Sequence, residues 1–234
     1  MNTLRERKNI KTYKLILDYL NKYNELFDDY ERDYLLKSVL RCRSKYNYNL
    51  DYLREIYDEL GLIPDDNNIY IGFSNFIKKN FDIENKNILE VGGGTLPRLA
   101  KRIINLTDKG TITVYDPRIS KYEKDTDRLI LKRENFNKKI DVRDKDLIIG
   151  LMPCKGAEPL IESAVENNKD FIVGLCEGGP HGDCYDFYES DEEWIDCMKL
   201  IAREGIKDNN MGKFNIKYLN KKYNYKYPII YNSR

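Results

Sequence analysis

The chain has 234 residues, 41% of them hydrophobic and 34% charged, so it is long enough to bury one full core and an accessory layer. Its 40 Lys and Arg residues balance its 39 Asp and Glu residues, which excludes a net field that would draw the whole protein to nucleic acid or to a membrane. The first residues lack the apolar run of a signal peptide, and five scattered cysteines suit a reducing compartment. We therefore expect a cytoplasmic protein with no membrane partner.

The N-terminal part of the chain has helical periodicity. Apolar side chains recur three and four residues apart over residues 13–23 and again over residues 50–60, and a third helix is predicted over residues 71–81. The pattern changes near residue 85. We therefore expect a helical cap at residues 1–85, lying over the strand ends of a second domain at residues 86–234.

The second domain alternates short apolar runs with helical segments. The runs that predict strands are residues 88–91, 112–115, 129–131, 147–151 and 171–175, and helical stripes cover residues 96–104, 157–167 and 191–203. This alternation predicts an α/β fold with a parallel sheet covered on both faces. Residues 116–128 and 132–145 are about the minimum length for a parallel crossover, so we expect a single helical turn or none in each.

The C-terminal residues are expected to close the sheet. Aromatic and β-branched runs at residues 213–219 and 227–232 flank the segment NKKYNYK, which is typical of an antiparallel hairpin. The expected fold is thus a doubly wound, mostly parallel sheet of seven strands that ends in an antiparallel pair.

Three successive glycines follow the first predicted strand and precede a helix, an arrangement typical of nucleotide-cofactor turns. Gly92 and Gly94 permit a tight turn and close backbone approach, Thr95 can cap the helix, and Pro97 suits its first turn. A phosphate-binding P-loop is excluded because no Gly-Lys-Ser or Gly-Lys-Thr follows. The dinucleotide fingerprint lacks its third glycine, because Pro97 occupies that place. A ligand-free strand–helix corner stays an alternative.

Two acids indicate what such a turn could hold. Glu90, at the end of the first strand, would repel a pyrophosphate but attract the ammonium and sulfonium groups of S-adenosylmethionine (SAM). Asp116, at the end of the second strand, can accept both hydroxyls of a ribose. NAD requires an acid there as well, so Asp116 supports an adenosine ligand without distinguishing the two.

The segments ILEVGGGTLPRLA and VYDPRI resemble motifs I and II of the class I SAM-dependent methyltransferases, and the terminal hairpin is similar to the antiparallel seventh strand of that Rossmann-like family. The resemblance implies that SAM is the cofactor, that Glu90 and the glycines face its methionine portion, and that Asp116 holds its ribose. The cofactor-binding residues implied are Glu90, Gly92, Gly93, Gly94, Leu96, Pro97, Asp116, Asn135, Phe136 and Met152. The pair Leu96-Pro97 is also similar to nicotianamine synthases, which transfer an aminocarboxypropyl group from SAM.

Segments that leave the fourth and fifth strands carry the candidate catalytic residues. We expect Glu177 or His181 to take the proton of the acceptor, with Cys154 as a further catalytic candidate and Cys176 as its counterpart on the next strand. A buried cysteine and a solvated histidine are the alternatives. Cys154, Cys176, His181 and Cys184 have no close cysteine pair, so we expect no metal site.

Charge is unevenly distributed near the C-terminus. Residues 177–196 contain eight acids and no Lys or Arg, whereas residues 207–234 contain seven bases and one acid. Two solvated faces would explain this pattern, and so would an acidic rim that attracts a cationic or amine acceptor. The charge pattern does not indicate RNA, which stays an alternative if the helical N-terminal region and the basic hairpin supply the contact surface. The functions considered are therefore a SAM-dependent methyltransferase on an unidentified acceptor, an aminocarboxypropyl transferase, or a non-catalytic SAM-binding or partner-binding module.

Overall fold

The computed structural model describes residues 4–27, 68–121, 123–176, 190–223 and 225–233, together with a few isolated residues between them. The chain divides into two compact units, Met1–Pro64 and Asp65–Arg234. The first unit contains helix α1 (Leu4–Lys22) and a short 3-10 turn, η1 (Asn24–Leu26), so the helix predicted over residues 13–23 is confirmed. The helix predicted over residues 50–60 lies mostly outside the described residues.

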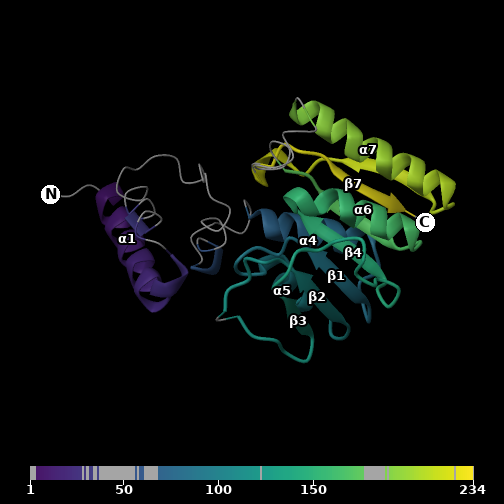
Figure 1. Ribbon diagram of the computed structural model, residues 1–234. Helices are drawn as coiled ribbons and strands as arrows, with labels where there is room; N and C mark the ends of the chain where they lie inside the picture. Colours follow the sequence, from purple (N-terminus) through teal and green to yellow (C-terminus); the bar gives the residue numbers. More distant parts are fainter. Residues whose placement is uncertain are drawn as a thin grey trace. The chain divides into compact units, whose positions relative to one another are not determined.

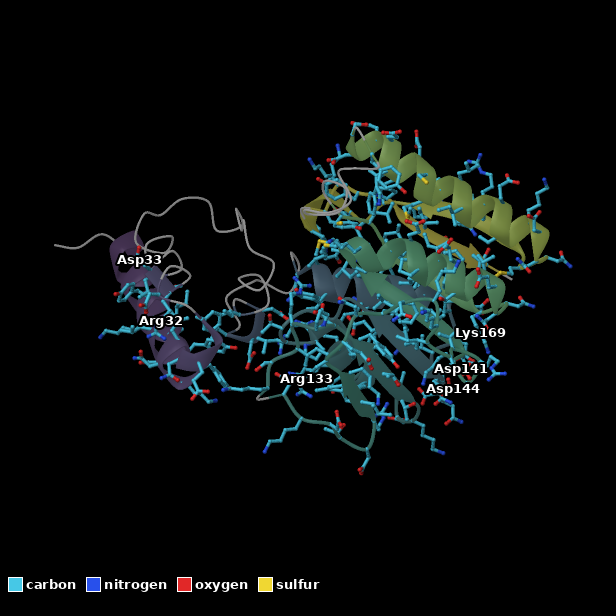
Figure 2. The ribbon with its side chains drawn as sticks, in the orientation of Figure 1. Arg32, Asp33, Arg133, Asp141, Asp144 and Lys169 are labelled. Atoms are coloured by element: carbon cyan, nitrogen blue, oxygen red, sulfur yellow. The ribbon has the colours of Figure 1, made fainter. Side chains whose placement is uncertain are left out.

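Aromatic stacking holds the end of α1. Tyr19 is buried, and its ring lies 4.7 Å from that of Tyr23 and 6.4 Å from that of Phe27. Arg32 returns to the helix and donates a hydrogen bond of 2.9 Å to the carbonyl of Leu20, which caps the C-terminal end of α1 (Figure 2).

The second unit is built on one seven-stranded sheet with the strand order β3-β2-β1-β4-β5-β7-β6 (Figure 1). Its strands are β1 (Asn87–Val91), β2 (Thr111–Tyr115), β3 (Leu129–Lys132), β4 (Leu147–Leu151), β5 (Asp170–Gly174), β6 (Lys213–Lys217) and β7 (Ile229–Ser233). Strands β1 to β5 are parallel, and β7 pairs antiparallel with both β5 and β6. The five predicted parallel strands and the terminal antiparallel pair are therefore confirmed, and the fold is Rossmann-like.

Helices cover both faces of this sheet, and each face has its own core. Helices α4 (Ile69–Asn80) and α5 (Arg98–Ile104) pack on one face, and α6 (Ala157–Glu166) and α7 (Asp191–Asp208) lie side by side on the other (Figure 1). Strand order reverses between β1 and β4. In open α/β sheets, ligands bind at such a switch point, beyond the carboxyl ends of the strands.

Helix α4 belongs with the sheet. Asn68 caps it by accepting the backbone N–H groups of Tyr70 and Ile71, and the buried side chains of Phe73 and Ile77 join the core beneath the sheet. The two compact units consequently divide at Pro64, whereas the change in sequence pattern lies near residue 85.

The two short connections contain turns but no helix among their described residues, as expected for their length. Arginine side chains hold these connections by hydrogen bonds to backbone carbonyls, where a longer connection would pack a helix on the sheet. Arg128 donates to the carbonyls of Thr107 and Gly110. Arg133 joins the loop after β2 by donating to the carbonyls of Ser120 and Glu123 (Figure 2). Arg128 thus fixes the amino ends of β2 and β3, and Arg133 fixes the loops at their carboxyl ends.

Candidate functional site

The glycine corner connects β1 to α5 at the switch point. Gly92 and Gly94 have φ angles of +78° and +74°, which favour glycine. A Cβ on Gly92 would lie 2.6 Å from the Cα of Pro153, and one on Gly93 would lie 2.2 Å from Cγ1 of Val114. These glycines therefore let the corner pack directly against the turn after β4 and against β2.

The start of α5 differs from the expectation. The helix begins at Arg98, and Pro97 occupies the N-cap position without a side-chain hydrogen bond. Thr95 does not cap it, because residues 94–97 form a turn ahead of the helix, in which the Thr95 carbonyl accepts the backbone N–H of Ser120. Leu96 is buried, so this turn is anchored in the core of the corner.

Glu90 is a buried acid in β1 beside the corner. Its side chain is 2% exposed, and Oε2 has no hydrogen-bond partner within the described residues. Burial raises its pKa to about 8; the Ala100 backbone amide opposes this shift, and the charge of Asp116 adds to it. At neutral pH the carboxyl group is mostly protonated. A cationic donor placed against Oε2 would satisfy the open acceptor and favour the ionised form.

Asp116 follows β2 and holds the corner from the other side. Its Oδ2 accepts the backbone N–H of Gly94 at 2.9 Å, which links the end of β2 to the glycines after β1. Its Oδ1 accepts the backbone N–H of Arg118 at 2.8 Å, as in an Asx turn. The Arg118 side chain binds the same carboxylate through Nε at 3.1 Å and Nη2 at 3.0 Å.

Arg118 is a residue of this site that the sequence pattern did not indicate. Its backbone hydrogen bond could have been anticipated, because Asp followed by Pro favours a turn in which the carboxylate accepts the backbone N–H two residues on. The side-chain pairing could not, because the guanidinium can point away equally well. Arg118 is 51% exposed, whereas Asp116 is 3% exposed, so the arginine covers a buried acid from the solvent side.

Asn135, Phe136 and Met152, which the resemblance implies are cofactor-binding residues, follow β3 and β4. Phe136 is buried and packs edge-to-face against Tyr115, with ring centroids 5.7 Å apart, whereas the neighbouring Asn135 is exposed. Met152, half-buried after β4, has a φ of +54° and donates its backbone N–H to the Gly174 carbonyl at 2.7 Å.

The candidate catalytic residues are only partly described. Cys154 is half-buried in the 3-10 turn η3 (Cys154–Gly156), next to Pro153, which touches the glycine corner. Glu177 and His181 lie outside the described residues. The described acids of the acidic segment include Asp191, Glu192 and Glu193, which occupy the first turn of α7, where they stabilise its N-terminus.

Within the described ranges, no group of three or more His, Cys, Asp or Glu side chains is placed to hold a metal ion; His181 and Cys184 are outside those ranges. The described helices include none with the length and apolarity needed to cross a bilayer.

Two cavities of about 400 Å³ lie away from the glycine corner. One is at the amino ends of β1, β4 and β5, where Lys86, Asp146 and Asp170 line it. The other runs along α5, between Arg98 and Lys124. Neither cavity is lined by Glu90 or Asp116.

No protein-family model matches the chain, and no curated protein matches it. Solved structures match at low identity. Human N-acetylserotonin methyltransferase in complex with SAM is 12% identical, with 94% of this chain and 70% of that chain covered and a TM-score of 0.45. A mutant of MtNAS in complex with SAM is 13% identical, with 98% and 76% covered and a TM-score of 0.42. A SAM-dependent methyltransferase from Aquifex aeolicus is 14% identical, with 76% and 96% covered and a TM-score of 0.39.

Proposed function

We propose that the second unit binds SAM at the carboxyl ends of β1 and β2 and that the protein is a SAM-dependent methyltransferase. The observation that carries this proposal is the open acceptor Oε2 of Glu90, a buried carboxyl group beside a left-handed glycine corner. The ammonium or sulfonium of SAM has the charge that this acceptor needs. The hydroxyls of its ribose suit the Asp116 carboxylate.

Glu90 favours a cation over the pyrophosphate of a dinucleotide. The pyrophosphate of NAD would approach the glycine corner, where Glu90 is in β1 and Asp116 accepts the Gly94 amide. The pyrophosphate would gain no charge attraction from the protonated form of Glu90 and would be repelled by its ionised form, whereas a cation stabilises the ionised form. The corner therefore favours a positively charged ligand.

SAM supplies an activated methyl group on a sulfonium, which already carries a good leaving group. The contribution of the chain is to orient that group and exclude water from it. Glu90 would hold the cationic end, and Asp116 would hold the ribose once the Arg118 side chain has moved aside. The aromatic pair Tyr115 and Phe136 would give the adenine an apolar neighbour.

The acceptor's proton needs a base on the same edge of the sheet. We retain Glu177 and His181 for this role from the sequence, because they follow β5 at its carboxyl end. Cys154 reaches the same edge from β4. The acidic segment that contains Glu177 supports a cationic or amine-bearing acceptor.

Calorimetric titration with SAM tests the cofactor. We expect Asp116→Asn and Glu90→Gln each to weaken SAM binding tenfold or more, because each removes a charge that the ligand uses. Asp141→Asn is a matched control: Asp141 is exposed and paired with Arg143, and it should bind SAM like the wild type. Failure of the wild type to bind SAM, or tighter binding of NAD, would refute the proposal.

Product analysis then identifies the bond that is broken. S-adenosylhomocysteine indicates methyl transfer. Methylthioadenosine would indicate the aminocarboxypropyl transfer that the Leu96-Pro97 pair suggests. Tight binding of SAM with no turnover on amine, RNA or protein pools would favour a binding module.

A further inference from the structure

Two cysteines meet at the carboxyl ends of adjacent strands. The Sγ atoms of Cys154 and Cys176 are 3.8 Å apart, and the Cys176 thiol donates toward the Cys154 sulfur. Cys154 follows β4 and Cys176 follows β5, and the β4–β5 register brings Leu151 opposite Gly174 just before them. Cys154 is half-buried and Cys176 is buried, so one member of the pair is accessible from solvent.

We propose that Cys154 and Cys176 are a reversible thiol–disulfide site. Cys154 and Cys176 lie three and two residues beyond the paired ends of strands that are about 4.8 Å apart, and a disulfide spans Cα separations of about 4.4–6.8 Å. The sulfurs must approach from 3.8 Å to about 2 Å, which side-chain rotation can achieve because Cys154 lies in a turn and not within the ladder.

The oxidation is balanced by a small-molecule disulfide such as oxidised glutathione. The Cys154 thiolate attacks one sulfur of that disulfide, which releases one glutathione thiolate and leaves a mixed disulfide on Cys154. The Cys176 thiolate then attacks the Cys154 sulfur and displaces the second glutathione. Two protein thiols lose two electrons and two protons, and the oxidant becomes two thiols.

The bond would fix a strained turn. Met152 and Cys154 have φ angles of +54° and +48°, unusual for residues with a side chain, and they flank Pro153. Pro153 is the residue against which Gly92 packs. A disulfide from Cys154 to Cys176 would therefore limit the motion of the turn at residues 152–154, which packs against the glycine corner. This effect of the disulfide on the corner does not depend on which ligand the corner holds.

The test uses the full chain with Cys42, Cys184 and Cys197 replaced by serine, so that only the pair remains. Incubation with oxidised glutathione should remove two hydrogens per chain, and peptide mapping should find Cys154 joined to Cys176. In the same background, Cys176→Ser should accumulate glutathione on Cys154, whereas Cys154→Ser should react slowly, because Cys176 is buried. Absence of the bond in this background, or pairing of either cysteine with another one in the wild type, would overturn the proposal.

Hydrogen exchange measures the coupling in the wild type, which needs no substitution. We expect slower amide exchange in the oxidised than in the reduced protein, both in residues 150–158 and in residues 90–97. Equal exchange of residues 90–97 in both forms would refute the link from the thiols to the corner. Neither measurement contains SAM, so failure here is distinguishable from failure of the proposed function.

Discussion

Arg118 binds both carboxylate oxygens of Asp116, with Nε at 3.1 Å from Oδ1 and Nη2 at 3.0 Å from Oδ2. The Gly94 amide donates to the same Oδ2, so the buried Asp116 carboxylate joins the half-exposed Arg118 side chain to the glycine corner. A hydroxyl ligand that binds Asp116 must compete with the guanidinium, which is half exposed, but it can leave the Gly94 contact intact. Arg118 thus opposes binding of a ligand at Asp116.

Removing this competitor should strengthen binding. We expect Arg118→Ala to bind SAM several-fold more tightly than the wild type, with a change in unfolding free energy below about 1 kcal/mol because the pair is partly exposed. Calorimetric titration measures the affinity. Arg143→Ala, which breaks an exposed pair with Asp141, should leave it unchanged. Weaker binding by Arg118→Ala would mean that Arg118 contacts the ligand.

Glu90 should make stability fall as pH rises. Its pKa is about 8 in the folded chain and near 4.5 as its ordinary value, so between these pH values the native state holds a proton that the unfolded state has released. Relative to Glu90→Gln, the wild type should lose about 1.4 kcal/mol of unfolding free energy per pH unit within this window. Denaturation at pH 5, 6, 7 and 8 checks the slope. Parallel curves for the two proteins would contradict a buried, protonated Glu90.

SAM binding should release the Glu90 proton. Below pH 8 the carboxyl group is mostly protonated, and a cationic ligand favours its ionised form. Affinity should therefore rise with pH up to about 8 and level off above it. Calorimetry in two buffers of different ionisation enthalpy counts the protons released, and Glu90→Gln subtracts those that the ligand itself contributes. Equal proton release by both proteins would be inconsistent with this role.

Gly93→Ala should destabilise the corner. Its new Cβ would lie 2.2 Å from Cγ1 of Val114, so β2 and the corner must separate, at a cost of about 1–3 kcal/mol. Val114→Ala removes the obstructing methyl groups. In a double-mutant cycle by chemical denaturation, the pair should lose less than the sum of the two single variants. Additive losses would show that the contact is not the cause.

Asn232→Ala should destabilise the sheet by about 1–3 kcal/mol, because it leaves the buried N–H of Phe171 without its acceptor at 2.8 Å. The Asn232 amide also donates to Asp170 and to the Met211 carbonyl. Thermal unfolding measures the loss. Asn215→Ala, on the neighbouring edge strand, removes a less buried amide and should cost less.

The parallel strands were predictable because each contains a short apolar run, which in β4 is buried throughout, and such a run can be recognised without knowing its neighbours. The corner was predictable because three glycines between a strand and a helix are costly elsewhere. Strand order within the terminal pair was not predictable: periodicity makes both runs strands but does not decide that β7, and not β6, pairs with β5.

The contacts of the site depended on distances across the sheet. Position 93 requires glycine because Val114 lies against it, and position 92 requires glycine because Pro153 lies against it. Both neighbours are remote in sequence. The meeting of Cys154 and Cys176 depends on the β4–β5 register. The residue types led us to expect a positively charged ligand, because an acid beside the glycines attracts a cation. They could not show that Arg118 covers the acid.

The position of β7 constrains the order of assembly. Because β7 is made after β6 yet lies between β6 and β5, β6 has no strand to pair with until Ile229–Ser233 leaves the ribosome. A chain that stops before Ile229 would contain the residues of β1 to β5, but the hydrogen-bonding edge of β5 would be exposed. The segment Lys213–Lys217 would have no strand to pair with. Aggregation of nascent or truncated chains should therefore begin at that uncovered edge.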